Sequence, residues 1–134
     1  MSNSATALAD VTGLSFTALA NTTYIVEVIG TFQSAAITTG IALALNIPSG
    51  TVTGQIRANI SATAINSLEQ IANDATTSVS TATRAVATNT PITAKFIVAV
   101  GGTGGTVALR FRSEVAASAV TMKADVTALG YRTI

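Results

Sequence analysis

Apolar and polar side chains alternate with a two-residue period along most of this chain, most clearly in its last third. Over residues 106–113, Val107, Leu109 and Phe111 share one face of the run, and Arg110 and Arg112 share the other. The alternation resumes after a short turn, over residues 120–127. A two-residue period of this length is typical of half-buried antiparallel strands and not of helices. We therefore expect two strands here, joined as a hairpin over residues 106–126.

Shorter alternating runs predict further strands over residues 14–17, 24–32, 41–47, 51–62, 78–87 and 92–100. In the run 24–32, Val26 and Val28 alternate with Ile25 and Ile29, which predicts a central strand covered on both faces. Turn signals about every 8–12 residues are typical of sandwiches and barrels. The expected fold class is all-β: an antiparallel β-sandwich, jelly-roll-like, with about eight strands.

Two segments differ from this pattern. In residues 62–75, Ala62, Ile65, Leu68 and Ile71 recur at a three-residue spacing, which fits a short helix; a long loop is the alternative, and both stay open. Residues 1–12 are small and polar, so we expect a flexible N-terminal arm. The remaining residues, 13–134, are expected to form a single β-sandwich domain, because 134 residues suffice for one core and not for two.

Composition points to subunit association. Hydrophobic residues make up 49% of the chain and charged residues 10%, with a net charge of +1, whereas charged residues usually approach a quarter of a soluble chain. The longest apolar stretch, 37–47, is interrupted by polar residues and falls short of the roughly 20 residues of a membrane span. We therefore expect a homo-oligomer, with no membrane partner. The basic residues are scattered, so no nucleic-acid partner is expected either.

The residue types argue against an enzyme. The chain has neither Cys nor His, which removes thiolate ligands and the commonest general base. Six dispersed carboxylates leave paired-carboxylate chemistry open, yet we expect no catalytic, cofactor or metal site. The loop 101–105 is rich in glycine, but a strand and not a helix follows it, so a turn is favoured over a phosphate site.

Four charged residues are candidate inter-subunit contacts: Glu27, Arg110, Arg112 and Glu114. The two arginines share a strand face and could hold carboxylates such as Glu27 or Asp125 of a neighbour by bidentate hydrogen bonds. An ordinary solvated face is the alternative for the arginines. For Glu27, which lies among apolar residues, a buried salt bridge with Arg110 or Arg112 is the favoured explanation.

Several segments together resemble a β-rich module of tailed-bacteriophage structural proteins. They are Leu14-Ser15-Phe16 with Ala20-Asn21-Thr22-Thr23-Tyr24, the run from Phe32-Gln33-Ser34-Ala35 to Ala42-Leu43-Ala44-Leu45-Asn46, and the run from Leu109-Arg110-Phe111-Arg112-Ser113-Glu114 to Ala124. No single segment is specific, and the resemblance rests on their order and spacing. It covers both ends of the chain well and residues 55–90 poorly.

The resemblance implies a compact β-sandwich that associates, often as a trimer, and that has no catalytic motif. It implies a non-enzymatic virion protein, with a capsid decoration or cement protein as the first expectation. The partners would be further copies of the chain and the major capsid protein or other virion proteins, on the head surface. A tail- or fibre-associated module that recognises a host glycan or protein is the alternative.

Overall fold

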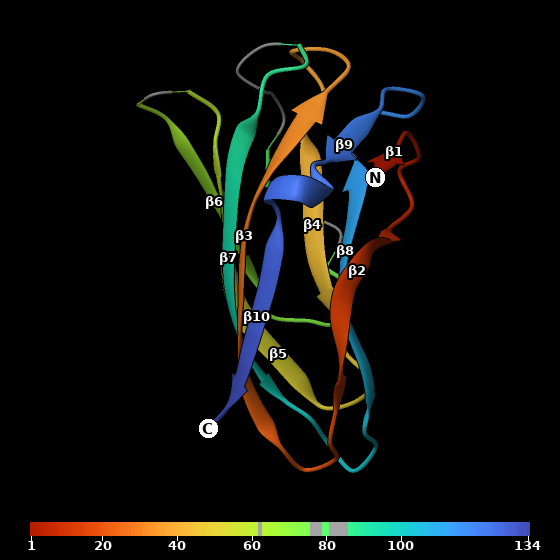
Figure 1. Ribbon diagram of the computed structural model, residues 1–134, viewed down its shortest axis with the longest axis vertical. Helices are drawn as coiled ribbons and strands as arrows, with labels where there is room; N and C mark the ends of the chain where they lie inside the picture. The colour runs from red at the N-terminus through yellow and green to blue at the C-terminus, as the bar shows by residue number, and fades with distance from the viewer. Residues whose placement is uncertain (62, 76–78, 81–85) are drawn as a thin grey trace.

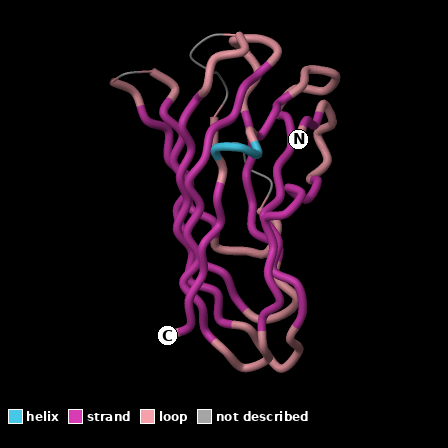
Figure 2. The backbone as a smooth tube through the Cα atoms, viewed as in Figure 1, coloured by secondary structure: helices cyan, strands magenta, loops and turns pink. Residues whose placement is uncertain are grey.

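A computed structural model describes residues 1–61, 63–75, 79–80 and 86–134, and it shows two antiparallel sheets packed face to face (Figure 1). The elements, in chain order, are β1 (Ser2–Asn3), β2 (Ala9–Ala18), β3 (Thr23–Ser34), β4 (Ile41–Asn46), β5 (Thr51–Asn59), β6 (Ile65–Gln70), β7 (Thr90–Ala99), β8 (Gly105–Ser113), β9 (Val120–Met122), the 3₁₀ turn η1 (Ala124–Val126) and β10 (Ala128–Thr133). In the described part of the chain, η1 is the sole helical element (Figure 2). None of the described helical structure is long and apolar enough to cross a membrane.

The strand order is that of a jelly roll. The large sheet has the order β1-β9-β3-β7-β5-β6, with β10 also paired to β3, and the small sheet has the order β2-β8-β4. Early strands pair with late ones in a nested way: β2 with β8, β3 with β7, and β5 with β6. The strands β2, β3, β4 and β5 thereby alternate between the two sheets, as in two interleaved Greek keys. The predicted all-β, jelly-roll-like sandwich is confirmed, with ten described strands in place of about eight.

The core lies between the two sheets and is built from the inward residues of each alternating strand. The large sheet contributes Val26, Val28 and Phe96, and the small sheet contributes Leu109 and Phe111. All five are at most 1% exposed. Burying a large apolar side chain contributes about 1.5–3 kcal/mol, so this double layer is the main source of stability.

The predicted hairpin over residues 106–126 is wrong, although its first apolar face is buried as expected. β8 belongs to the small sheet, whereas β9 pairs with β1 and β3 in the large sheet. The strand also ends at Met122, because η1 interrupts the pattern before β10 begins. Alternation identifies a strand and its buried face, but it does not identify the neighbouring strand.

Neither of the alternatives left open for residues 62–75, a short helix or a long loop, describes Ile65–Gln70, which forms β6. Its apolar spacing misleads because the strand turns Ile65 outward, where it is 58% exposed, and buries Gln70 completely. Ile71, just after the strand, is 74% exposed. The strand expected over 78–87 falls mostly outside the described residues.

Residues 1–12 are paired within the sandwich, and this corrects the expectation of a flexible arm. β1 pairs with β9, and β2 begins at Ala9. The Met1 amino group donates to the Met122 carbonyl at 2.8 Å, and Asn3 Nδ2 donates to the Phe111 carbonyl at 3.0 Å. Backbone pairing of this kind needs no apolar pattern, which is why the small polar sequence gave no sign of it.

β3 is central, as predicted, but it is covered on one face only. Val26 and Val28 are fully buried, whereas Ile29 on the other face is 68% exposed. The expectation that both faces would be covered is therefore wrong within this single chain. An apolar strand face is left open on the outside of the large sheet.

Candidate functional site

The four predicted contact residues lie at two separate places. Arg110, Arg112 and Glu114 belong to the end of β8 and the loop after it, whereas Glu27 lies on the outer face of the large sheet. The expected buried salt bridge from Glu27 to Arg110 or Arg112 is wrong. Glu27 Oε1 lies 2.9 Å from Lys95 Nζ, and both side chains are exposed, by 54% and 78%.

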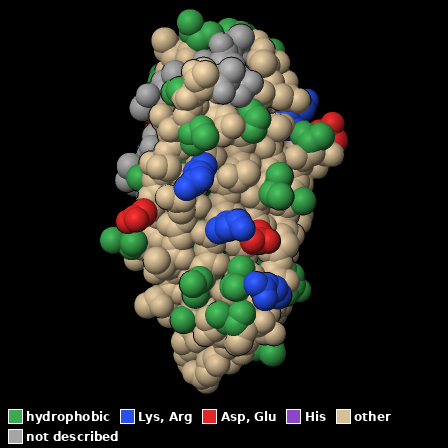
Figure 3. Space-filling view, turned by 90° about the vertical axis from the view of Figure 1, so that its left-hand side faces the viewer, with side chains coloured by type: hydrophobic (Ala, Val, Ile, Leu, Met, Phe, Trp, Pro, Cys, Tyr) green, Lys and Arg blue, Asp and Glu red, His purple; other side chains and the backbone are tan. Residues whose placement is uncertain are grey.

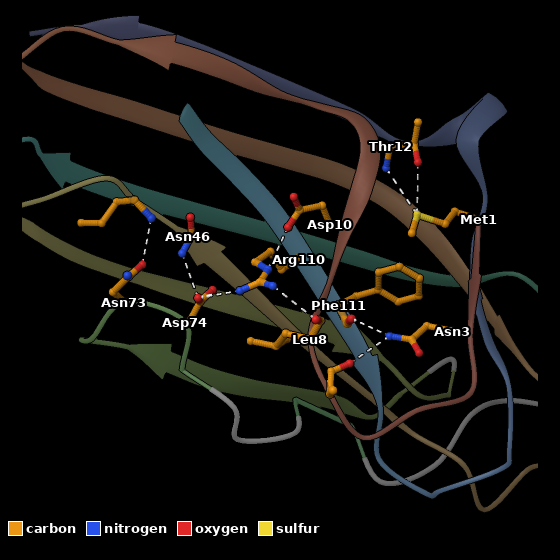
Figure 4. A network of polar contacts seen from close by, with 12 residues as sticks. Met1, Asn3, Leu8, Asp10, Thr12, Asn46, Asn73, Asp74, Arg110 and Phe111 are labelled. Carbon is orange, nitrogen blue, oxygen red and sulfur yellow. Dashed lines mark hydrogen bonds and ion pairs between the residues drawn. The ribbon is translucent and has the colours of Figure 1, made fainter. Parts of the chain in front are cut away.

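Arg110 is held by groups of its own chain (Figure 4). Its Nη1 donates to Asp74 Oδ2 at 2.7 Å, and its Nη2 donates to the Leu8 carbonyl at 3.3 Å. Its Nε lies 2.8 Å from Asp10 Oδ1, as an ion pair without the alignment of a hydrogen bond. Asp74 Oδ2 also accepts from Asn46 Nδ2 at 2.8 Å. Arg110 thereby fastens β8 to the start of β2 and to the segment after β6.

Arg112 and Glu114 also make contacts within their own chain. Arg112 Nη1 donates to the Ser113 carbonyl at 3.0 Å. Glu114 Oε2 accepts from the Gly40 amide at 3.2 Å, and the Gly40 carbonyl accepts from the Glu114 amide at 3.1 Å. The Glu114–Gly40 contacts join the end of β8 to the start of β4. The role that they support is structural.

The outer face of the large sheet is the other candidate, and we define it as the outward side chains of β6, β5, β7, β3 and β10. The strand register places one row of these positions side by side across all five strands. That row contains Glu69, Gln55, Lys95, Glu27 and Gly130. Its centre is the Lys95–Glu27 ion pair.

Isoleucines flank the charged row. Ile97 of β7 lies opposite Ile25 of β3, and Ile25 in turn lies opposite Arg132 of β10. Ile29 and Ile97 are 68% and 53% exposed. Figure 3, which views this side of the molecule, shows apolar and charged side chains intermixed on it. The outer face is therefore an open surface on which isoleucines flank a central ion pair.

A shallow depression of about 550 Å³ lies on the outer face. Its lining includes Glu69, Gln55, Lys95 and Arg132 together with apolar groups. Phe96, the aromatic residue of the lining, is 1% exposed and belongs to the core. The depression offers hydrogen-bonding and charged groups to a ligand, but no exposed ring among its described residues.

The field at the centre of the outer face favours an ionised Glu27. The hydrogen bond from Lys95, and next the charge of Lys95, lower the pKa of Glu27 below its ordinary value. Burial opposes this shift, and the Arg132 charge, the weakest of these effects, adds to it. The carboxylate is therefore charged at neutral pH and down to more acidic conditions than usual.

Three of the described carboxylates, those of Glu27, Asp10 and Asp74, lie in ion pairs. Across the described ranges no three Asp or Glu side chains gather where they could hold a metal ion. Asp10 and Asp74 are both paired with Arg110, which lies between their carboxylates. The alternating pattern of residues 92–100 puts Lys95 and Ile97 on the same strand face, so the sequence did contain a signal for them. Sequence reasoning followed only the buried face of that strand, so it missed both residues.

Comparisons with known proteins leave the chain without an assigned family. No family model matches it, and no curated protein matches it. A solved structure described as that of infectious bursal disease virus, Gx strain, is similar at 13% identity with a TM-score of 0.19. The alignment covers 100% of this chain and 33% of the viral chain, so this chain spans a third of that protein's length. A likeness at that TM-score carries no argument about fold or function. The class that the structure itself defines is a jelly-roll β-sandwich with an exposed sheet face.

Proposed function

We propose that this chain is a non-enzymatic structural protein of a bacteriophage virion, and specifically a capsid decoration or cement protein. The observation that carries the proposal is the outer face, where Ile29 and Ile97 are exposed by 68% and 53% in a chain with only 10% charged residues. Apolar surface of this kind gains about 25 cal/mol for each Å² buried against another surface. The resemblance of both ends of the chain to phage structural modules supports the virion setting.

A cement protein of this kind would stabilise a capsid by binding the assembled shell and not the dissociated subunits. Any partner that binds only the assembled state raises the stability of that state by mass action. The hydrogen-bonded strands of the large sheet suit such a role, because they present the outer face without having to become ordered on binding. The partners would be further copies of the chain and the major capsid protein.

The proposal is tested by adding the purified chain to phage heads that lack it. We expect saturable binding of hundreds of copies per head, and a higher melting temperature of the shell in calorimetry. Ile97→Lys should weaken the binding, whereas Leu19→Lys should not, because Leu19 is at least as exposed as Ile97, at 66% against 53%, but lies on the β2–β3 turn. An absence of binding to heads, or a few copies confined to a tail, would contradict the proposal.

The depression on the outer face favours one alternative, a tail- or fibre-associated module that recognises a host glycan or protein. Gln55, Glu69 and Arg132 supply the polar groups that such recognition needs. The two functions are distinguished by copy number and by position on the particle. Glycan-array binding that Gln55→Ala removes, from a protein located at the tail tip, would establish the alternative.

A further inference from the structure

We infer that two copies of this chain pack face to face through the outer faces of their large sheets, about a two-fold axis that runs between β3 and β7. The inference rests on the proposed function, which assigns this face to subunit contacts, and it names the first partner as a second copy. It also specifies which residues meet.

The strand register makes the outer face complementary to itself. Across the β3–β7 boundary, Glu27 lies opposite Lys95 and Ile25 lies opposite Ile97. A two-fold axis along that boundary, parallel to the strands and in the plane of the interface, exchanges the two strands. It therefore sets Lys95 of one copy over the partner's Glu27, and Ile97 over the partner's Ile25. In such an isologous interface every one of these contacts occurs twice.

The arrangement of charges favours this axis over two parallel axes, one centred on β7 and one centred on β3. With the axis between β3 and β7, two lysines and two glutamates alternate around a ring, so each Lys95 lies near two carboxylates. An axis centred on β7 would set Lys95 against Lys95, and an axis centred on β3 would set Glu27 against Glu27. Like charges facing each other across an interface cost several kcal/mol. The ion pair at 2.9 Å within each copy already holds both side chains in position.

The apolar groups beside the ring provide the driving force. Ile25 and Ile97 of both copies would form one buried cluster on one side of the charges, and Thr93, which lies opposite Ile29, would pack on the partner's Ile29 on the other side. An axis parallel to the strands keeps the two sheets aligned, which is a common way for sheet faces to pack. With the axis between β3 and β7, the four strands β10, β3, β7 and β5 face their counterparts. They span about 4.8 Å each and about eight residues at about 3.4 Å, on the order of 500 Å² in projection. Side-chain relief brings the accessible area toward the roughly 800 Å² per partner of a standard interface.

Complementary charge reversals test the pairing, with mass measured by sedimentation over a range of micromolar concentrations. The wild-type chain should have the mass of two chains and dissociate on dilution. Glu27→Lys leaves two cations at the centre of the face, and Lys95→Glu leaves two anions, so each variant alone should have the mass of one chain. A 1:1 mixture should recover the mass of two chains, because a cationic face then meets an anionic one.

Two controls separate association from folding. Asp125→Lys makes the same charge change as Glu27→Lys on the exposed turn η1, away from the outer face, and should leave the wild-type mass unchanged. Circular dichroism of each variant should match the wild type, because exposed ion pairs contribute little to folding. A variant that lost its fold would not regain mass on mixing, so recovery in the mixture also reports that both partners are folded.

Three results would overturn the inference: a wild-type chain that stays monomeric, an oligomer whose mass neither reversal changes, and a mixture no heavier than its components. The proposed function is tested separately, by the binding of the chain to phage heads. A monomer that still saturates heads would overturn the two-fold pairing and leave the proposed function standing. A dimer that does not bind heads would leave the two-fold pairing standing and overturn the proposed function.

Discussion

The side-chain amide of Gln70 pairs with the backbone of Leu45 as a neighbouring strand would. Gln70 Oε1 accepts from the Leu45 amide at 2.9 Å, and Gln70 Nε2 donates to the Leu45 carbonyl at 2.8 Å. The amide and carbonyl of Leu45 are directed away from β8, and Gln70 is completely buried at the end of β6. Asn73 continues the pattern by accepting from the Ile47 amide at 2.8 Å. Gln70 and the segment after β6 thus satisfy part of the open side of β4.

Replacing Gln70 with leucine should destabilise the fold by roughly 1–3 kcal/mol, because it leaves the buried Leu45 amide unpaired. The Leu45 carbonyl loses one donor but keeps the Asp74 amide at 3.3 Å. Urea unfolding followed by circular dichroism measures the loss. The matched control is Gln55→Leu, since Gln55 is an exposed glutamine on β5. Equal midpoints for the two variants would show that the Gln70 amide does not act as a strand neighbour.

The Gln70 contact also shows where sequence reasoning stops. Alternation predicted most strands and their buried faces, including Leu109 and Phe111, because the apolar pattern directly reflects which side meets the core. It failed over 62–75 because β6 buries a glutamine and exposes Ile65, which is the reverse of the usual preference. A buried side-chain amide that hydrogen-bonds to the backbone of the other sheet leaves no periodic signal in the sequence.

The candidate site was predictable only in part, for a related reason. The sequence identified Glu27 as a charge among apolar residues, and it placed Ile25 and Ile29 on a second apolar face. It did not identify Lys95 as the ion-pair partner, because that requires the register of β3 against β7. The partners of Arg110 were missed likewise, since Asp10 and Asp74 are brought to it from opposite ends of the chain.

The two carboxylates around Arg110 should differ in their importance for folding. The Asp74 side chain is 28% exposed and also accepts from Asn46, whereas the Asp10 side chain is 68% exposed. Asp74→Asn should therefore cost about 1–3 kcal/mol, and Asp10→Asn less than about 1 kcal/mol. Asparagine tolerates the positive φ of 51° at position 74, so backbone strain would not explain a loss of stability in Asp74→Asn.

Thermal unfolding of the two Asn variants, run in parallel with the wild type, checks this prediction. Arg110→Lys serves as a third variant, because a single ammonium group cannot reach Asp74, Asp10 and the Leu8 carbonyl together. It should resemble Asp74→Asn in its loss of stability. An Asp10→Asn variant that proved the less stable of the two would contradict the assignment of Asp74 as the principal partner.

Gly50 is required by both its backbone conformation and its surroundings. Its φ is +95°, and a Cβ there would lie 2.0 Å from the Ala99 carbonyl oxygen. Gly13 has a similar φ of +81°, with no atom within 4 Å of such a Cβ. Gly13→Ala should therefore cost about 1 kcal/mol from backbone strain alone, and Gly50→Ala at least about 3 kcal/mol. Chemical denaturation compares them, and equal losses would mean that the β4–β5 turn relaxes away from Ala99.

The pKa of Glu27 should depend on two cations, strongly on Lys95 and weakly on Arg132. Lys95 lowers the pKa of Glu27 through a hydrogen bond and its charge, whereas Arg132 acts through charge alone. Carboxyl NMR over a pH titration should show Glu27 with a pKa below that of an ordinary glutamate, a large upward shift in Lys95→Met and a smaller one in Arg132→Met.

Because the pKa of Glu27 is lowered, the pH range over which Glu27 contributes to stability can be stated. Because folding lowers the pKa of Glu27, its contribution is present above the unfolded value of about 4.3 and is lost as the pH falls through the lowered folded value. Melting temperatures of the wild type and Lys95→Met should therefore converge in acid and separate only weakly at neutral pH, since both side chains are exposed. A Glu27 pKa that Lys95→Met leaves unchanged would show that the pair does not persist in solution. The centre of the outer face would then lose its fixed alternation of charge.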